Sequence, residues 1–194
     1  MGENLSIRLE RAAHHEAGHV VVAAARKLRL RSEGVIVDAD GEGLACFCKR
    51  PDNTDISRES CILASLSGFF AERRFCDLKG YACPSPHDLA VILGPDWKEA
   101  REIQGKLTNG YLRGRGSGDV LKALEDDSEK IVLRYWTEIE AVAHAILAKS
   151  FEPLQPLKSG AHWSNRLEAR CVPGVELVKI LEGLGISALC VDEC

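Results

Sequence analysis

Two histidines and a glutamate near the N-terminus have the residue types and the spacing of a catalytic metal site. The segment His15-Glu16-Ala17-Gly18-His19 places the two histidines four positions apart. On a helix such residues share one face, with Cβ atoms roughly 5–6 Å apart, so both imidazoles can bind one ion. Glu16 is offset from that face and can reach a water on the ion without taking a coordination position. The pattern predicts a Zn²⁺ site with His15 and His19 as ligands and Glu16 as the catalytic base.

The competing interpretation is that these histidines are ordinary surface residues of a helix. The neighbouring residues are small and apolar: Ala12, Ala13, Ala17, Val20 and Val21. These apolar residues would place the helix in a core and so bury both imidazoles. Buried imidazoles need polar partners, and a metal ion is such a partner. The metal interpretation is therefore favoured. His14 lies off the His15/His19 face, and we expect it to be solvated or to contact the ligands from outside the coordination sphere.

A third protein ligand must come from another segment. A catalytic zinc usually has three protein ligands and a water, and no further histidine or glutamate follows His19 at the short spacing of other HExxH enzymes. The acidic candidates near helix starts or in constrained loops are Glu72, Asp77 and Asp88. For Glu72 we expect a helix-surface or buried capping role. The residues alone leave this choice open.

The elements that must position these residues are mostly helices. Apolar periodicity and capping residues predict helices over about 6–30, 57–75, 87–107, 119–150 and 175–184, the third with an interruption at Gly94-Pro95. A β-branched run and turn residues predict a hairpin over about 34–50. The expected fold class is mainly α with a small β-hairpin or sheet, an α+β protein. We expect residues 1–159 to form the metallopeptidase-like domain and 160–194 an accessory segment packed on it.

The composition excludes several classes of function. The net charge is −4 and the basic residues are dispersed, so no nucleic acid partner is expected. The longest apolar runs are far below the roughly 18–20 residues that cross a bilayer, so no membrane partner is expected. The N-terminal sequence has no apolar leader, which predicts a cytoplasmic location and reduced thiols for the eight cysteines.

Several segments in order resemble one family. HHEAGHVVVAAA resembles the zinc motif of the protease domain of FtsH-type membrane-bound AAA metalloproteases, which shares Gly18. GVIVDADGEGLACF resembles that domain's hairpin after the zinc helix, ILASLSGFFAERRF its helix with a glycine followed by Ala-Glu, and SPHDLAVI its Asp-Leu segment. The resemblance covers about residues 8–150 and implies the helical zinc-peptidase fold of that domain. It also implies that Asp88 is the third zinc ligand.

The resemblance further implies how a substrate binds. In the similar family a polypeptide lies beside a hairpin strand, which here corresponds to Leu44, Ala45, Cys46 and Phe47. Pairing with a strand edge gives hydrogen bonds that depend little on sequence. The chain has no P-loop GxxxxGK[ST] for ATP. We therefore expect an ATP-independent, stand-alone relative that cleaves peptides and unfolded or flexible polypeptides, with a separate ATPase or a homo-oligomer as further partners.

Two other classes of function remain open. The first is a module without catalytic activity, which keeps the metal for stability. It would use the substrate groove of the peptidase family to bind peptides, or it would act as a scaffold. A metal-dependent hydrolase of a non-peptide amide would need the same zinc chemistry, so the motif does not separate it from a peptidase.

Overall fold

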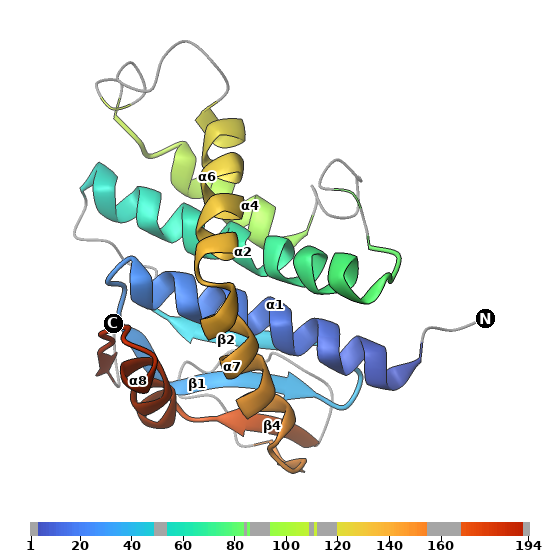
Figure 1. The fold of residues 1–194 in the computed structure, drawn as a ribbon. Coiled ribbons are helices and arrows are strands. Elements are labelled where there is room, and N and C mark those ends of the chain that lie inside the picture. The colour runs from blue at the N-terminus through green and yellow to red at the C-terminus, as the bar shows by residue number, and fades with distance from the viewer. Residues whose placement is uncertain are drawn as a thin grey trace.

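The protein is mainly helical with one small sheet, as the sequence predicts (Figure 1). The computed structural model describes residues 4–48, 54–83, 85, 94–108, 111, 120–154 and 168–191. The helices are α1 (Leu5–Ala25), α2 (Asp55–Lys79), α4 (Pro95–Gln104), α6 (Val120–Arg134), α7 (Trp136–Leu147) and α8 (Gly174–Gly183). The strands are β1 (Leu30–Asp38), β2 (Gly43–Phe47), β3 (Glu152–Pro153), β4 (Glu168–Val172) and β5 (Cys190–Val191).

Helix α1 carries the histidine motif through the centre of the fold. The Asn4 side chain accepts a hydrogen bond from the Ser6 amide at 3.0 Å and caps the helix start. The buried residues of α1 are concentrated between Ala12 and Ala24, so the motif lies in its buried half. The helix ends at Ala25, five residues before the expected end near Leu30, because strand β1 already begins at Leu30.

Helix α2 packs closely along α1 at a glycine. A Cβ atom on Gly18 would lie 2.6 Å from Ala71 Cβ and 2.7 Å from the Ser67 carbonyl oxygen, so only glycine allows this approach. The buried Ser67 hydroxyl donates to the Gly18 carbonyl at 3.0 Å and holds the two helices together. The glycine of the His-Glu-Ala-Gly-His segment therefore has a packing role, which brings α2 side chains next to the histidines.

The sheet has the strand order β2-β1-β4-β3, with β5 pairing in parallel with β1. Strands β1 and β2 form the predicted antiparallel hairpin, and β2 is the edge strand of this order. In the turn, Asp38 Oδ1 accepts the amides of Asp40 and Glu42 at 2.9 and 3.0 Å, and Gly41 supplies a positive φ of 79°. Strand β4 pairs antiparallel with β1, so part of the C-terminal segment builds this sheet.

The remaining elements differ from the expectations in detail. The long helix expected over 119–150 is two helices, α6 and α7, separated at Tyr135. The expected interruption at Gly94-Pro95 is the start of α4, and the preceding residues 86–93 lie outside the described part of the chain.

The cysteines and the helix lengths bear on two further expectations. Six of the described cysteines are free thiols, but Cys48 is disulfide-bonded, which corrects the expectation of fully reduced cysteines. Within the described residues, no helix has both the length and the apolar character that crossing a membrane requires.

Candidate metal centre

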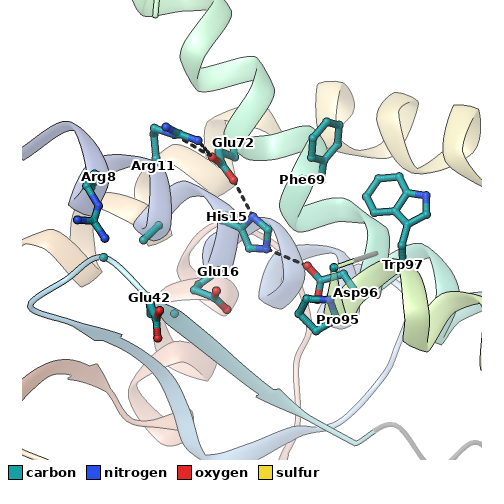
Figure 2. A pocket seen from close by; sticks show the side chains of 14 residues that line it. Arg8, Arg11, His15, Glu16, Glu42, Phe69, Glu72, Pro95, Asp96 and Trp97 are labelled. Atoms are coloured by element: carbon teal, nitrogen blue, oxygen red, sulfur yellow. Dashed lines mark hydrogen bonds and ion pairs between the residues drawn. The ribbon is translucent and has the colours of Figure 1, made fainter. Parts of the chain in front are cut away.

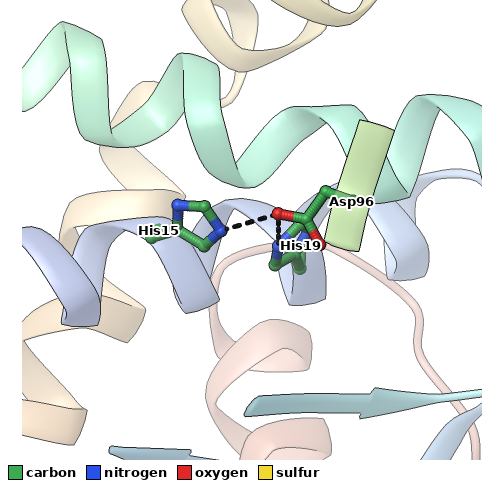
Figure 3. Close-up of side chains that lie close together, drawn as sticks. All are labelled: His15, His19 and Asp96. Carbon is green, nitrogen blue, oxygen red and sulfur yellow. Dashed lines mark hydrogen bonds and ion pairs between the residues drawn. The ribbon is translucent and has the colours of Figure 1, made fainter. Parts of the chain in front are cut away.

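Three side chains from two helices meet at one point. His15 and His19 lie one turn apart on α1, with ring centroids 4.8 Å apart. Asp96, in the first turn of α4, places Oδ2 3.1 Å from His15 Nε2 and 3.6 Å from His19 Nε2 (Figure 3). The three candidate ligand atoms all lie within 4.8 Å of one another. This is a preformed group of two imidazoles and one carboxylate.

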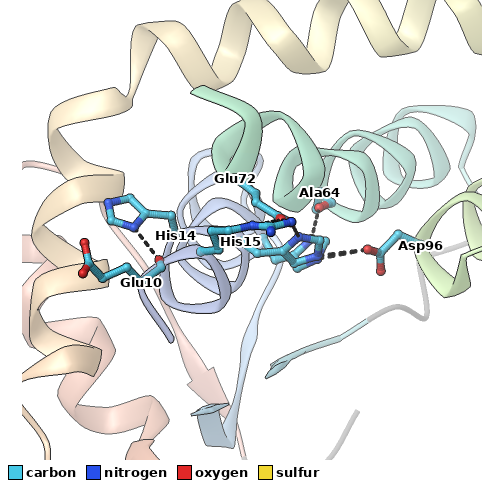
Figure 4. A network of polar contacts seen from close by, with 8 residues as sticks. Glu10, His14, His15, Ala64, Glu72 and Asp96 are labelled. Atoms are coloured by element: carbon cyan, nitrogen blue, oxygen red, sulfur yellow. Dashed lines mark hydrogen bonds and ion pairs between the residues drawn. The ribbon is translucent and has the colours of Figure 1, made fainter. Parts of the chain in front are cut away.

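The outer nitrogens of both histidines are held by acceptors. His19 Nδ1 lies 2.7 Å from the Ala64 carbonyl oxygen, and His15 Nδ1 lies 3.0 Å from Glu72 Oε2 (Figure 4). Because a carbonyl and a carboxylate accept hydrogen bonds, each Nδ1 carries the proton and donates it. In the neutral imidazole, each Nε2 then presents a lone pair toward Asp96. Metal-binding histidines are fixed in this way in zinc proteins.

The site has more acceptors than donors, and this favours a cation. Two Nε2 lone pairs and an anionic oxygen face one another, so a proton or a metal ion must lie between them. Burial alone would lower the pKa of His15, but hydrogen bonds to Asp96 and Glu72 outweigh it and raise that pKa. Burial alone would raise the pKa of Asp96, but His19 and His15 outweigh it and lower that pKa. Without metal, the cluster therefore attracts a proton to the position a metal would take.

Asp96 is held in place by the start of α4. Pro95 is at the first position of the helix, where its fixed φ favours a helix start, and Asp96 follows it. The next residue, Trp97, is buried and packs edge-to-face on Phe69 with ring centroids 5.2 Å apart. Its Nε1 donates to Glu125 of α6 at 3.3 Å. A rigid helix start and a buried anchor thus present the Asp96 carboxylate.

Glu72 is a second carboxylate at the centre, on the outer side of His15. Its Oε1 accepts from Arg11 Nε at 2.8 Å and from Arg11 Nη2 at 2.5 Å, while Oε2 contacts His15 Nδ1. Burial alone would raise the pKa of Glu72, but His15 and Arg11 outweigh it and lower that pKa. Glu72 is therefore anionic and orients His15. Its role is neither a metal ligand of this cluster nor only a helix cap.

Glu16, the predicted base, is buried beside the cluster. It is 5% exposed, lines two cavities that adjoin the ligands and contributes to the raised pKa of His15. Its carboxylate packs against Gly43 of β2, where a Cβ atom would lie 2.3 Å from Glu16 Oε1. Figure 2 shows Glu16 between the α1 ligands and the β2 edge. From there it can act on a molecule lying between α1 and β2.

Two cavities adjoin the ligands. The first, which we call the Arg8 cavity, measures about 530 Å³ and is lined by Arg8, Arg11, Ala12, His15, Glu16, Gly41, Glu42, Gly43, Phe69, Glu72, Gly94, Pro95, Asp96 and Trp97. The second, the Glu99 cavity, measures about 420 Å³ and is lined by His15, Glu16, His19, Gly43, Leu44, Ala45, Phe47, Ser65, Pro95, Asp96 and Glu99. Since His15, Glu16 and Asp96 line both, the cluster lies where the two cavities join.

The structure brings together most of the residues expected from the sequence. His15, His19 and Glu16 lie in one site, and Leu44, Ala45 and Phe47 line the Glu99 cavity beside them. The fourth residue expected to bind substrate, Cys46, lines neither of these two cavities.

The third carboxylate of the cluster comes from a position that sequence reasoning missed. Asp88 lies outside the described residues, and the carboxylate that the structure places against both histidines is that of Asp96. A proline followed by an acidic residue at a helix start marks Gly94-Pro95-Asp96, and this signal could have identified it. Its distance from the histidines in sequence hides the contact.

His14 differs from its expected solvated position. It is buried, and its Nδ1 lies 2.7 Å from the Glu10 carbonyl oxygen (Figure 4). Its ring stacks on Phe75 with ring centroids 4.2 Å apart. Burial lowers its pKa. His14 therefore belongs to the packing of α1 on the side away from Asp96.

Comparisons with protein-family models, with curated protein sequences and with solved structures each find no match to this chain. The function of the chain must therefore be inferred from the geometry of the site and from the sequence pattern.

Proposed function

We propose that this chain is a zinc-dependent endopeptidase that hydrolyses unfolded or flexible polypeptides, with a fold like that of FtsH-type protease domains. The observation that carries the proposal is the convergence of His15 Nε2, His19 Nε2 and the Asp96 carboxylate beside Glu16. Two imidazole nitrogens and one carboxylate oxygen are a donor set that catalytic zinc sites use, with a fourth position left for water.

The chain's own residues divide the reaction between them. A zinc ion held by His15, His19 and Asp96 supplies Lewis-acid activation of the scissile carbonyl and of water. Glu16 takes the proton of the attacking water and passes it to the leaving nitrogen, which then departs as a neutral amine. Glu72 and Ala64 keep both Nδ1 protons in place, so the imidazoles hold a fixed orientation throughout.

The surroundings of the cluster favour a polypeptide substrate cut within its length. The Arg8 cavity and the Glu99 cavity both reach the shared ligands, so together they offer room for a chain that continues beyond the scissile bond. Strand β2 lies at the edge of the sheet and contributes Leu44, Ala45 and Phe47 to the Glu99 cavity. An extended peptide beside β2 would thus present its backbone to Glu16.

The test combines zinc loading with cleavage of an unfolded protein. Zinc-loaded wild type is expected to cut a casein-like substrate and to spare a stably folded domain, unless a separate ATPase unfolds that domain. Glu16→Gln should retain zinc and lose cleavage by roughly 10²–10⁴-fold, because the amide is isosteric and cannot accept the proton.

The matched control is Glu102→Gln, the same change at an exposed position of α4, which should leave cleavage unchanged. A chain that binds zinc and peptide but cuts nothing would favour a catalytically silent peptide-binding module. Wild-type turnover in Glu16→Gln would contradict the assigned base.

A further inference from the structure

Arg8 lines the same cavity as the metal ligands, two helical turns before His15 on α1. This spacing places the two residues on nearly the same face of the helix and roughly 10 Å apart along its axis. In the view of Figure 2, Arg8 lies at the end of the cavity away from Asp96 and Trp97. An extended peptide advances roughly 3.3 Å per residue, so Arg8 lies about three or four residues from a bond that is cut at the cluster.

Strand β2 and the turn before it connect the cluster with Arg8. Gly43, the first residue of β2, lies against the Glu16 carboxylate, where a Cβ atom would be 2.3 Å from Glu16 Oε1. Gly41, in the turn, packs against Arg8, and a Cβ atom there would lie 3.1 Å from the carbonyl carbon and oxygen of Arg8. Both glycines line the Arg8 cavity. A peptide beside β2 that continues past Gly43 is therefore directed toward Arg8.

The guanidinium of Arg8 is free to bind a ligand. Arg8 is exposed, and its side chain forms no ion pair and no hydrogen bond within the part of the chain that the structure describes. Arg11, the other arginine of this cavity, is instead paired with Glu72. Glu42 of the turn lines the same cavity without pairing with Arg8. A planar guanidinium binds a carboxylate through two parallel hydrogen bonds, so a carboxylate is the ligand that suits Arg8 best.

We propose that Arg8 binds a carboxylate of the substrate three or four residues from the scissile bond, so that the peptidase prefers an acidic group at that place. The carboxylate belongs either to an Asp or Glu side chain or to the C-terminal end of the polypeptide, since both present the same two oxygens. The proposal rests on the peptidase function proposed above and names its substrate class. A neutral amide at that place pairs more weakly with Arg8, and a lysine is repelled.

The experiment compares peptides that differ at one position. Product masses first identify the bond that the zinc-loaded wild type cuts in a peptide without charged side chains. Glu, Gln or Lys is then placed three or four residues from that bond, on either side. A further pair of peptides ends three or four residues beyond the bond, with a free carboxylate or an amide.

In at least one of these comparisons, kcat/KM for the carboxylate should exceed that for its neutral counterpart about threefold to tenfold, as expected for an arginine pair near the surface. Lys should give the slowest cleavage at the same place. A preference for Glu within the peptide identifies a side chain as the source of the carboxylate, and a preference limited to the free terminus identifies the chain end.

Variants then assign the effect to Arg8. Arg8→Gln should abolish the preference, and Arg8→Glu should reverse it, so that Lys or the amide becomes the faster substrate. The wild-type preference should also shrink in about 1 M salt, where the screening length falls to about 3 Å. Arg134→Gln, the same change at an exposed arginine of α6 that lines neither cavity, should keep the preference in full. Equal rates for charged and neutral peptides in every comparison, or a preference that survives in Arg8→Gln, would overturn the proposal.

A binding measurement separates this proposal from the peptidase function. Zinc-loaded Glu16→Gln is titrated with fluorescent forms of the carboxylate peptides and their neutral counterparts, and fluorescence anisotropy gives each Kd without cleavage. Tighter binding of a carboxylate peptide that is lost in Glu16→Gln/Arg8→Gln supports the role of Arg8 even if no peptide is cut. Equal Kd values for charged and neutral peptides in Glu16→Gln overturn it even if the wild type is an active peptidase.

Discussion

Replacing Gly68 with alanine should abolish tight zinc binding, because Gly68 of α2 makes room for both histidines. A Cβ atom at this position would lie 2.4 Å from His19 Nε2, 2.6 Å from His19 Cε1 and 2.7 Å from His15 Cδ2. Ordinary contact begins near 3.4 Å, so His19 Nε2 must retreat by about 1 Å. Zinc–ligand distances tolerate only about ±0.2 Å.

His19 has little freedom to retreat. The residue is 5% exposed, and its Nδ1 is bound at 2.7 Å to the carbonyl of Ala64, one turn before Gly68 on the same helix. Loss of hydrogen bonds around zinc ligands already costs about 10–100-fold in affinity, so displacement of a ligand itself should cost at least about a hundredfold. Helix propensity by itself would make the Gly68→Ala protein more stable, since alanine is favoured over glycine inside a helix by roughly 1 kcal/mol.

The assay is zinc competition with a chromophoric chelator at a temperature where circular dichroism shows both proteins folded. Gly183→Ala is the matched control, because a Cβ atom at this α8 position meets nothing within 4 Å. It should bind zinc like the wild type. Wild-type zinc affinity in folded Gly68→Ala would refute the placement of the metal between these histidines.

The same cluster supports three further predictions. Asp96→Asn should lower zinc affinity more than tenfold, as expected for a ligand. Asp88→Asn, at the ligand that the family resemblance implies, should leave zinc affinity unchanged. A loss in Asp88→Asn with none in Asp96→Asn would assign the ligand role to Asp88 instead. Gly43→Ala should reduce turnover but not zinc affinity. The added Cβ would lie 2.3 Å from Glu16 Oε1, and its three nearest atoms all belong to Glu16. Turnover equal to that of the wild type would show that the Glu16 carboxylate does not lie against Gly43 in the active protein. In the metal-free protein, the lowered pKa values of Asp96 and Glu72 stabilise the fold above their ordinary values of 3.8 and 4.5, and this effect is lost as pH falls. The raised pKa of His15 stabilises the fold below 6.5, and that effect is lost as pH rises through the raised value. The stabilising contribution of these three groups should therefore be greatest between pH 4.5 and 6.5, measured as the loss of melting temperature in metal-free Glu72→Gln relative to wild type; a loss that is greatest above this window would contradict the ion pairs.

The local features of the site can be predicted from the sequence. Residues four apart on a helix share a face whatever the rest of the chain does, so the spacing alone pairs His15 with His19. The hairpin is equally local, because the run of β-branched residues Val35-Ile36-Val37 and the turn around Gly41 specify it. These features depend on neighbours within a few residues.

The contacts between distant segments cannot be predicted in the same way. Asp96 is 81 residues from His15 and Glu72 is 57, and their positions depend on how α2 and α4 pack on α1. That packing depends on close approach at Gly18 and on the buried Trp97, which periodicity alone does not reveal. The break at Tyr135 likewise interrupts a continuous apolar pattern.

X-ray absorption at the zinc edge of the zinc-loaded wild type tests the central claim most directly. It should show one four-coordinate zinc per chain, with two imidazole nitrogens at about 2.0–2.1 Å and oxygen ligands at about 2.0–2.2 Å. Sulfur scattering at about 2.3 Å, or a zinc without imidazole ligands, would place the metal elsewhere and contradict the site formed by His15, His19 and Asp96.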